Sequence, residues 1–323
     1  MYINLSKKRI CLRFFFGLCF AMRFALHCLQ NPVVQSREQC IKQKGMLLAM
    51  HQFLTPSTTA EAAQFLKEKL NLRIIAGGTD LIIALKDNPC DYLMDVKKIP
   101  ELQSIQLTDA NLEIGAAVTL NEMLESGLLT GWYEALGQSA ASVGNVLLRN
   151  RATLVGNICN ASPAGDTLPS CLVTNAFIKT IVFGASRSIL LKDFFVGVRK
   201  NALAPGQMVS MVVIPKNEGV SVFRKKKRIR GHDIAQVSVA ASYSKDGNLN
   251  IAYGSAAPTP LLLKMGTFRL PDFKSNKEMI LEKALKSTAP ISDVRSAKDY
   301  RTAMLKYLTN EVLDEIIEKQ NVT

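Results

Sequence analysis

Two glycine-containing turns are the residues best suited to chemistry in this sequence of 323 residues. The first reads Ala-Gly-Gly-Thr-Asp-Leu at residues 76–81, and the second reads Arg-Asn-Arg-Ala-Thr-Leu-Val-Gly-Asn at residues 149–157 and runs on to Asp166. Glycine leaves backbone N–H groups unshielded, so each turn can cradle an anion such as the pyrophosphate of a dinucleotide. Because about 75 residues separate the turns, we expect a ligand that is clamped from both sides.

The second turn lies in a stretch that is rich in amide and hydroxyl side chains. Buried amides and hydroxyls need hydrogen-bond partners, and the many oxygens of a ribityl chain or a phosphate supply them. A long polar surface loop is the alternative, although the Pro and Gly of residues 161–165 are typical of a fixed conformation. The polar residues are Asn145, Asn150, Thr153, Asn157, Asn160, Asp166 and Thr167.

The common nucleotide-binding glycine patterns are absent from the sequence. No two glycines stand two positions apart, so the G-x-G element of Rossmann folds is missing. The glycine and lysine spacing of a P-loop is missing too. Any dinucleotide must therefore be held by a different fold.

The residues of both turns, extended to Pro169, resemble the FAD-binding subunit of molybdenum hydroxylases, a family that includes xanthine dehydrogenase and carbon monoxide dehydrogenase. Three later stretches resemble the same family in order and spacing, so that the match runs over roughly residues 50–308. These stretches are residues 193–197 with 206–209, residues 233–237 and residues 256–260.

The resemblance implies an oxidoreductase subunit of a heterotrimer. A large subunit would oxidise the substrate at molybdopterin, a small subunit would carry [2Fe–2S] clusters, and this chain would pass electrons through FAD to NAD. Residues 160–169 are most similar to xanthine or purine dehydrogenases, but carbon monoxide, nicotinate and aromatic-substrate enzymes share much of this segment. A stand-alone flavin reductase or oxidase with the same FAD-binding fold is the alternative. No catalytic side chain is expected here, because FAD carries the chemistry.

The resemblance also implies roles for individual residues. Residues 73–80 would wrap the FAD pyrophosphate and residues 152–156 would close over it from the other side, while Asp166 would bind ribityl or adenylate hydroxyls. Met208 and Phe223 would contact the flavin, and Lys225 would place a positive charge near the isoalloxazine. The implied set is Arg73, Ile74, Ile75, Ala76, Gly77, Gly78, Thr79, Asp80, Ala152, Thr153, Leu154, Val155, Gly156, Asn157, Asp166, Met208, Phe223 and Lys225.

Val155 is the one visible departure from the family pattern, which usually has two consecutive glycines at this point. A β-branched residue would be strained there if the backbone required a positive φ. The sequence therefore predicts a clamp that binds FAD less tightly at this position.

The net charge of +13 is unevenly distributed, since residues 1–49 carry +7 of it. The sharpest remaining cluster is the basic run at residues 224–230, which lacks the interleaved aromatic side chains that stack on bases. We therefore expect no nucleic-acid partner. The run is interpreted as a solvated strand end, or as a surface that attracts NAD or an acidic partner subunit.

Residues 1–49 do not fit the remainder of the sequence. The apolar residues 14–22 imitate a signal peptide, but Arg23 and His27 interrupt them, and no stretch reaches the roughly 20 apolar residues of a membrane span. We expect an extension that precedes the true start at Met46 or Met50, with a targeting segment as the alternative. No membrane partner is expected.

The seven cysteines show no metal-ligand spacing. Four of them lie within residues 1–49, and Cys90, Cys159 and Cys171 are dispersed. This pattern predicts no zinc site or iron–sulfur cluster on this chain, and it is typical of a reducing cytoplasm.

The order of the predicted helices and strands favours an α+β fold. The family resemblance implies a two-lobed, non-Rossmann FAD-binding domain of the PCMH type, as in vanillyl-alcohol oxidase, at residues 50–216. A small C-terminal domain of antiparallel sheet and helices would follow at residues 217–323. Helices are predicted at residues 58–70, 120–126, 277–286 and 299–318, and strands at residues 72–76, 92–96, 112–117, 176–183, 208–214, 235–244 and 248–256.

Overall fold

The computed structural model describes residues 52–183 and 185–322, without the side chain of residue 322. The interpretation of residues 1–49 as an extension lies outside the described residues. In the part of the chain that is described, no helix is long and apolar enough to cross a bilayer.

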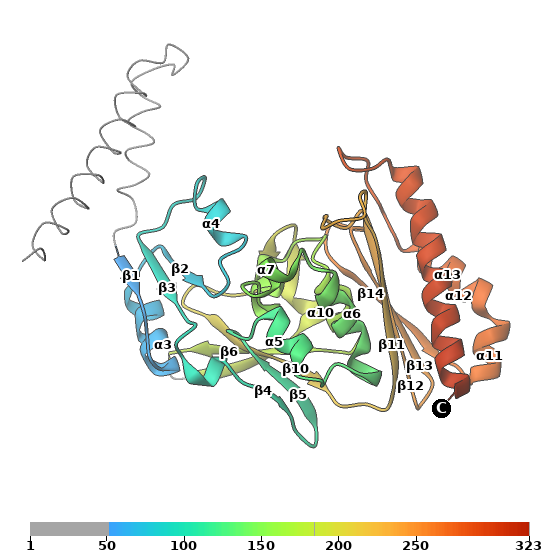
Figure 1. Cartoon of the computed structure of the whole chain (residues 1–323), viewed down its shortest axis with the longest axis horizontal. Coiled ribbons are helices and arrows are strands. Elements are labelled where there is room, and N and C mark those ends of the chain that lie inside the picture. Colours follow the sequence, from blue (N-terminus) through green and yellow to red (C-terminus); the bar gives the residue numbers. More distant parts are fainter. Residues whose placement is uncertain (1–51, 184, 323) are drawn as a thin grey trace, which may run out of the picture. The chain divides into compact units, whose positions relative to one another are not determined.

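A three-stranded parallel sheet forms the first part of the described chain (Figure 1). Its elements are β1 (Gln52–Leu54), α3 (Thr59–Glu68), β2 (Leu72–Ile75), α4 (Leu81–Ala84) and β3 (Tyr92–Asp95). The order is β1-β3-β2, and the central β3 buries Leu93 and Met94. Helix α3 connects β1 to β2, and the Thr58 side chain caps it by accepting a hydrogen bond from the Glu61 N–H at 3.1 Å. The predicted start of this helix is confirmed.

A five-stranded antiparallel sheet follows, with the order β4-β5-β10-β6-β7. Its strands, with one short helix, are η1 (Pro100–Leu102), β4 (Ile105–Leu107), β5 (Asn111–Gly115), β6 (Phe177–Val182), β7 (Ala185–Leu190) and β10 (Met208–Pro215). Strand β10 is central and pairs with both β5 and β6. The predicted strands at 112–117, 176–183 and 208–214 are confirmed within about two residues.

The segment between β5 and β10 contains most of the helices of this part. They are α5 (Leu120–Glu125), η2 (Gly131–Tyr133), α6 (Glu134–Ser142), α7 (Val146–Arg149), α8 (Leu154–Asn160), α9 (Thr167–Val173) and α10 (Leu191–Phe194), followed by the short strands β8 (Phe195–Gly197) and β9 (Lys200–Asn201). The prediction of a turn at residues 149–157 is wrong at Arg149, where α7 ends, and from Leu154 onward, where α8 begins. Thr153 caps this helix, and the complete burial of Leu154 and Ile158 outweighs the low helix propensity of its sequence.

A four-stranded antiparallel sheet in the order β11-β12-β13-β14 completes the chain. Its elements are β11 (Gly219–Lys226), β12 (Val237–Ser244), β13 (Asn248–Gly254), β14 (Leu261–Thr267), α11 (Leu270–Ser275), α12 (Lys277–Lys286) and α13 (Lys298–Val322). Helix α13 packs on β11 and β12, whereas α6 packs on β11 and α9 on β12 and β13 (Figure 1). The strands predicted at residues 235–244 and 248–256 are confirmed as β12 and β13, which pair antiparallel, and Gly247 between them has the positive φ of +82° that favours glycine there.

Two hydrophobic cores stabilise these elements. The larger core joins the five-stranded sheet to α5, α6, α8 and α9, and the second core lies between the last sheet and α13. The observed mixture of helices with mainly antiparallel sheets confirms the predicted α+β class. The domain boundaries at 49/50 and 216/217 stay a prediction.

Candidate functional site

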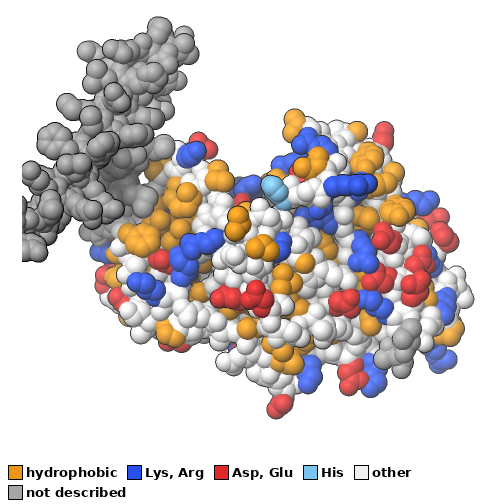
Figure 2. Space-filling view, viewed as in Figure 1, with side chains coloured by type: hydrophobic (Ala, Val, Ile, Leu, Met, Phe, Trp, Pro, Cys, Tyr) orange, Lys and Arg blue, Asp and Glu red, His pale blue; other side chains and the backbone are white. Residues whose placement is uncertain are grey.

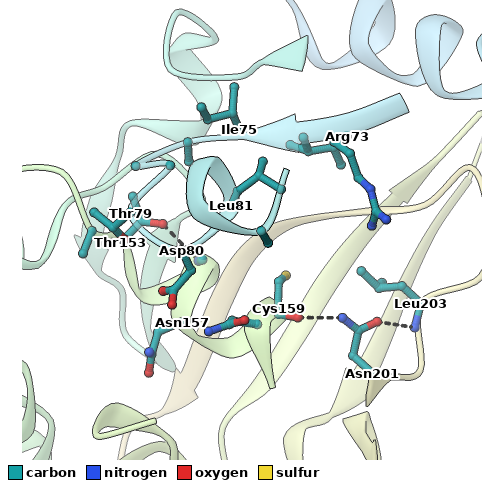
Figure 3. A pocket seen from close by; sticks show the side chains of 18 of the residues that line it. Arg73, Ile75, Thr79, Asp80, Leu81, Thr153, Asn157, Cys159, Asn201 and Leu203 are labelled. Carbon is teal, nitrogen blue, oxygen red and sulfur yellow. Dashed lines mark hydrogen bonds between the residues drawn. The ribbon is translucent and has the colours of Figure 1, made fainter. Parts of the chain in front are cut away.

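A cavity of about 770 Å³ brings most of the predicted site residues together (Figure 3). Its walls come from β2 and the turn after it, from α8, and from residues 199–207. Twelve of the eighteen predicted residues line it: Arg73, Ile74, Ile75, Ala76, Gly77, Gly78, Thr79, Asp80, Ala152, Thr153, Gly156 and Asn157. The other six do not line it: Leu154, Val155, Asp166, Met208, Phe223 and Lys225.

The two predicted turns touch each other through their backbones at the wall of this cavity. A Cβ atom on Gly77 would lie 2.0 Å from the carbonyl oxygen of Arg151 and 3.0 Å from the Cα of Ala152. Gly78 has a φ of +73°, a conformation that side chains disfavour. The close approach of the two backbones therefore requires glycine at position 77, and the positive φ favours glycine at position 78.

The first turn is fixed by a hydrogen bond to one of its carbonyl oxygens, while three of its backbone N–H groups make no hydrogen bond within the described residues. Lys97 donates through Nζ to the carbonyl oxygen of Ala76 at 3.1 Å and to Asp95 at 2.7 Å. Within the described residues, the N–H groups of Gly77, Gly78 and Thr79 donate no hydrogen bond. Free backbone N–H groups at a cavity wall can bind an anion. Asp80 directly precedes α4, and its side chain makes no capping hydrogen bond to that helix.

Arg73 and the glycine turn occupy different ends of the cavity. Figure 3 shows Thr79 and Asp80 near Thr153 and Asn157, whereas the Arg73 guanidinium points toward Asn201 and Leu203. Arg73 therefore contributes positive charge to the cavity away from the glycine turn.

Val155 adopts helical geometry, so the condition for backbone strain is not met. It lies inside α8, it is absent from the residues with positive φ, and its side chain is buried. Gly156 also lies within α8, and its N–H donates to the Thr153 hydroxyl at 3.0 Å. The side chain at 155 therefore contributes to the core of the protein.

The amide side chains of this segment find many of their partners within the chain. Asn145 caps α7 by accepting from the Leu148 N–H at 2.9 Å, and Asn157 accepts from the Thr167 hydroxyl at 2.7 Å. Asn160 accepts from Arg199 at 3.2 Å. The amides thus hold the short helices in place, and only Asn157 and Asn160 of these three also line the cavity.

Asp166 and Lys225 form a buried ion pair, with Lys225 Nζ 2.5 Å from Asp166 Oδ2. The Lys225 side chain is only 3% exposed, and it also donates to the carbonyl oxygen of Ser142. The second carboxylate oxygen, Oδ1, is buried without a hydrogen-bond partner in the described structure. Burial raises the pKa of Asp166 to about 6, although Lys225 acts in the opposite direction.

Met208 and Phe223 are core residues of the described structure. Both side chains are almost completely buried and belong to the larger hydrophobic core. The Phe223 N–H donates to Gln138 at 2.7 Å, so this backbone donor is used within the chain. A flavin contact at either residue stays a prediction.

Two family models match the chain at consecutive positions. The FAD binding domain in molybdopterin dehydrogenase matches residues 49–217, and the CO dehydrogenase flavoprotein C-terminal domain matches residues 221–316. The chain belongs to this flavoprotein family. Both glycine turns of the FAD-binding subunit fall within the first match.

Individual relatives of the FAD-binding subunit agree with this assignment. The xanthine dehydrogenase FAD-binding subunit of Escherichia coli O157:H7 is 29% identical over 81% of this chain and 94% of its own length. The glyceraldehyde dehydrogenase medium chain of Sulfolobus acidocaldarius is 28% identical over 82% of this chain and 97% of its own. The structure of carbon monoxide dehydrogenase from Hydrogenophaga pseudoflava superposes with a TM-score of 0.75, at 23% identity, over 83% of this chain and 97% of that one. The predicted fold is thereby confirmed.

Sequence reasoning missed one wall of the cavity in the FAD-binding subunit. Arg199, Asn201 and Gln207 line it together with Leu203 and Pro205. Arg199 has a φ of +53°, and its N–H donates to the carbonyl oxygen of Ala161, which also has a positive φ. Neither residue type signals such a backbone conformation, so only the cluster of polar residues near β9 could have pointed to this wall.

Replacing Val155 by glycine is expected to weaken the fold without improving FAD binding. The change Val155→Gly removes a buried side chain and places a second glycine inside α8, which together lower the free energy of unfolding by about 2 kcal/mol. Urea unfolding and the bound flavin per chain measure the two effects. A rise in flavin content would show instead that Val155 obstructs the cofactor.

Stability is expected to fall as the pH rises through the pKa of Asp166. Its folded pKa of about 6 lies above the ordinary value of 3.8, so the folded chain binds this proton more tightly than the unfolded chain. The resulting stabilisation is complete below about pH 4 and is lost by about pH 7. It amounts to about 3 kcal/mol, at about 1.4 kcal/mol per pKa unit. Unfolding free energies at pH 4 and pH 7 should show this loss in the wild type and not in the double variant Asp166→Asn with Lys225→Met.

Proposed function

We propose that this chain holds FAD in the cavity between its two glycine turns and relays electrons within a molybdenum hydroxylase. The observation that carries the proposal is the backbone contact between Gly77 and Arg151, which places free N–H groups at the wall of one cavity. A volume of about 770 Å³ lies within the range of cofactor pockets. The residues present therefore fit a dinucleotide with a charged centre.

Different residues of the chain would bind different parts of FAD. Gly77, Gly78 and Thr79 would donate N–H groups to the pyrophosphate. Asp166 does not line this cavity, so the cofactor contact that the family resemblance implies requires FAD to extend beyond it; the unpartnered Oδ1 would then accept a hydrogen bond from a hydroxyl of the cofactor, while Lys225 would keep that carboxylate oriented. When bound, FAD supplies the ability to take up electrons singly and release them in pairs.

The substrate class of the whole enzyme belongs to the proposal as well. We favour a xanthine or purine dehydrogenase, with a molybdopterin subunit and a [2Fe–2S] subunit as partners, because a xanthine dehydrogenase subunit is among the most similar relatives. The glyceraldehyde dehydrogenase relative has nearly the same identity. The candidate substrates are distinguished by co-expressing the chain with its partner subunits and assaying xanthine, nicotinate, aldehydes and carbon monoxide. Oxidation of xanthine but of none of the other three substrates would support a xanthine dehydrogenase.

NAD is the proposed electron acceptor, and the basic run at residues 224–230 offers a test. Three of its side chains are engaged within the chain: Arg224 pairs with Glu311 and Glu315, Lys225 pairs with Asp166, and Lys227 donates to the carbonyl oxygen of Gly231. The Lys226 side chain donates no hydrogen bond to the described residues, unlike its neighbours in the run. Several side chains of the run are therefore used to stabilise this chain and are not available to bind the phosphates of a nucleic acid.

Reversing two charges of the run is expected to raise the KM for NAD about tenfold, because the attraction of the NAD phosphates becomes repulsion. The variant is Lys226→Glu with Lys227→Glu in the assembled enzyme, and the control is Lys283→Glu, at an exposed lysine of α12 that lines neither this run nor the cavity. Initial rates over a range of NAD concentrations give the result. If both the KM for NAD and the assembly of the enzyme are unchanged, the basic run does not take part in binding NAD.

A further inference from the structure

Arg301 is a buried arginine near the start of α13. Figure 2 shows Lys, Arg, Asp and Glu side chains at the surface in the region of α11, α12 and α13, whereas Arg301 is only 3% exposed. Its guanidinium pairs with Asp293, with Nη2 2.7 Å from Oδ1. Nη1 donates to the carbonyl oxygens of Gln236 at 2.6 Å and Ser255 at 3.4 Å. One guanidinium therefore connects the loop before α13, the start of β12 and the end of β13.

Stability alone is a weak reason to bury this arginine. Removing a guanidinium from water is costly, and apolar side chains in place of a buried ion pair are often equally stabilising. Nε of Arg301 is also buried without a hydrogen-bond partner in the described structure, which adds to that cost. A guanidinium does supply directed N–H groups, where a lysine offers only a point charge. Arg301 therefore fixes the relative positions of its three acceptors.

The first carbonyl acceptor leads to Lys225. Gln236 directly precedes β12, and its own N–H donates to the carbonyl oxygen of Lys226 at 2.9 Å. Lys226 is the last residue of β11, and Lys225 stands next to it. The Gln236 side chain is engaged as well, because Nε2 donates to the carbonyl oxygen of Arg295 at 2.9 Å. Arg301 thus holds the residue that fixes the end of the strand carrying Lys225.

The second carbonyl acceptor leads to Asp166. Ser255 directly follows β13 and has a φ of +57°, and its N–H donates to the carbonyl oxygen of Pro163 at 2.7 Å. Pro163 lies three positions before Asp166. A Cβ on Gly254 would lie 3.5 Å from the same carbonyl oxygen and 3.3 Å from the Pro169 ring. The end of β13 therefore packs against residues on both sides of Asp166.

We propose that Arg301 is a positioning residue for the flavin, because it holds the backbone on both sides of the Asp166 and Lys225 ion pair and so determines where that pair lies. The two connections converge, since Lys225 and Asp166 bind each other. The inference rests on the proposed function, in which Lys225 places a positive charge near the isoalloxazine and stabilises its reduced form. Arg301 does not line the cavity and acts through the backbone.

The test replaces Arg301 by lysine in the co-expressed three-subunit complex. Arg301→Lys keeps the charge, but a single ammonium cannot reproduce the directed N–H groups, so Lys225 should be held less firmly. We expect binding of reduced flavin, relative to oxidised flavin, to weaken about tenfold, which lowers the two-electron midpoint potential by about 30 mV. Spectroelectrochemical titration of the bound FAD measures this potential. A role in stability alone would lower the melting temperature and leave the potential unchanged.

Lys277→Met is the matched control, because it removes another ion pair of the C-terminal helices. Lys277 of α12 pairs with Asp314 of α13, and neither residue belongs to the two connections described above. We expect this variant to lose some thermal stability and to keep the wild-type flavin potential.

A second variant keeps the proposal testable if Arg301→Lys yields no folded flavoprotein. Asp293→Asn leaves the guanidinium in place and removes only the charge of its partner, so the potential should shift in the same direction by a smaller amount. An unchanged potential in whichever of the two variants folds with bound FAD would overturn the positioning role. Absence of FAD from the wild-type complex would instead overturn the proposed function, so the two failures are distinguishable.

Discussion

The variant Gly77→Ala is expected to lose at least nine tenths of the bound FAD. A Cβ at this position would lie 2.0 Å from the carbonyl oxygen of Arg151. The obstacle is backbone, which cannot swing aside as a flexible side chain could, so the two turns must separate. Overpacking of this kind costs about 1–3 kcal/mol of folding free energy. The flavin-to-protein ratio of the purified chain, from absorbance at 450 and 280 nm, measures the loss.

The matched control is Gly231→Ala, because a Cβ on Gly231 would meet no atom within 4 Å. It should retain the wild-type flavin content and thermal stability. Circular dichroism separates a loss of flavin from a loss of fold in the Gly77 variant. Full flavin content in Gly77→Ala would show that the contact between the turns does not shape the binding site.

The variant Lys225→Met is expected to lower the free energy of unfolding by about 3–5 kcal/mol, since it leaves the Asp166 carboxylate buried without its partner. Lys225 is 3% exposed and Asp166 is 10% exposed at the side chain, so water cannot replace the lost cation. Urea unfolding at pH 7 measures the change. We also expect weaker FAD binding, because Asp166 loses the group that orients it.

The double variant Asp166→Asn with Lys225→Met supplies the control for this prediction. Neutral side chains of similar size remove both buried charges, so at least half of the lost stability should return. The solvent-exposed pair Lys245 and Glu218 offers a comparison, and Lys245→Met should change the free energy of unfolding far less than Lys225→Met does, because water screens the exposed pair. Equal costs for Lys225→Met and Lys245→Met would contradict the account of a buried pair.

Much of the fold could be predicted because local patterns agree with the tertiary structure. The cap at Thr58, the hairpin at Gly247 and the apolar spacing of α13 each depend on neighbours in sequence, and the structure has these elements where the patterns placed them. The three helices between Asn145 and Val173 were missed for different reasons: α7 is only four residues long, whereas Gly and Asn in α8 and Pro and β-branched residues in α9 lower the helix propensity. Burial of their apolar side chains decides their conformation, and burial depends on distant strands.

The candidate site was predicted in part for the same reason. The turn at Gly77 can be found from its sequence, but its contact with Arg151 cannot, because the two lie in different parts of the chain. The wall with Arg199 and Asn201 depends on left-handed backbone at a residue that is not glycine. The resemblance to the flavoprotein family supplied Asp166 and Lys225, and the structure adds that they form one buried pair.

Stoichiometric binding of FAD is the most direct test of the central proposal. The full chain, purified with its partner subunits and extracted by heat, should release about one FAD per chain, which chromatography distinguishes from FMN. Protection of the peptide that contains residues 76–81 from hydrogen exchange should increase when FAD is present. Less than a tenth of an equivalent of FAD in a folded complex supplied with excess FAD would contradict the proposal that the two glycine turns hold this cofactor.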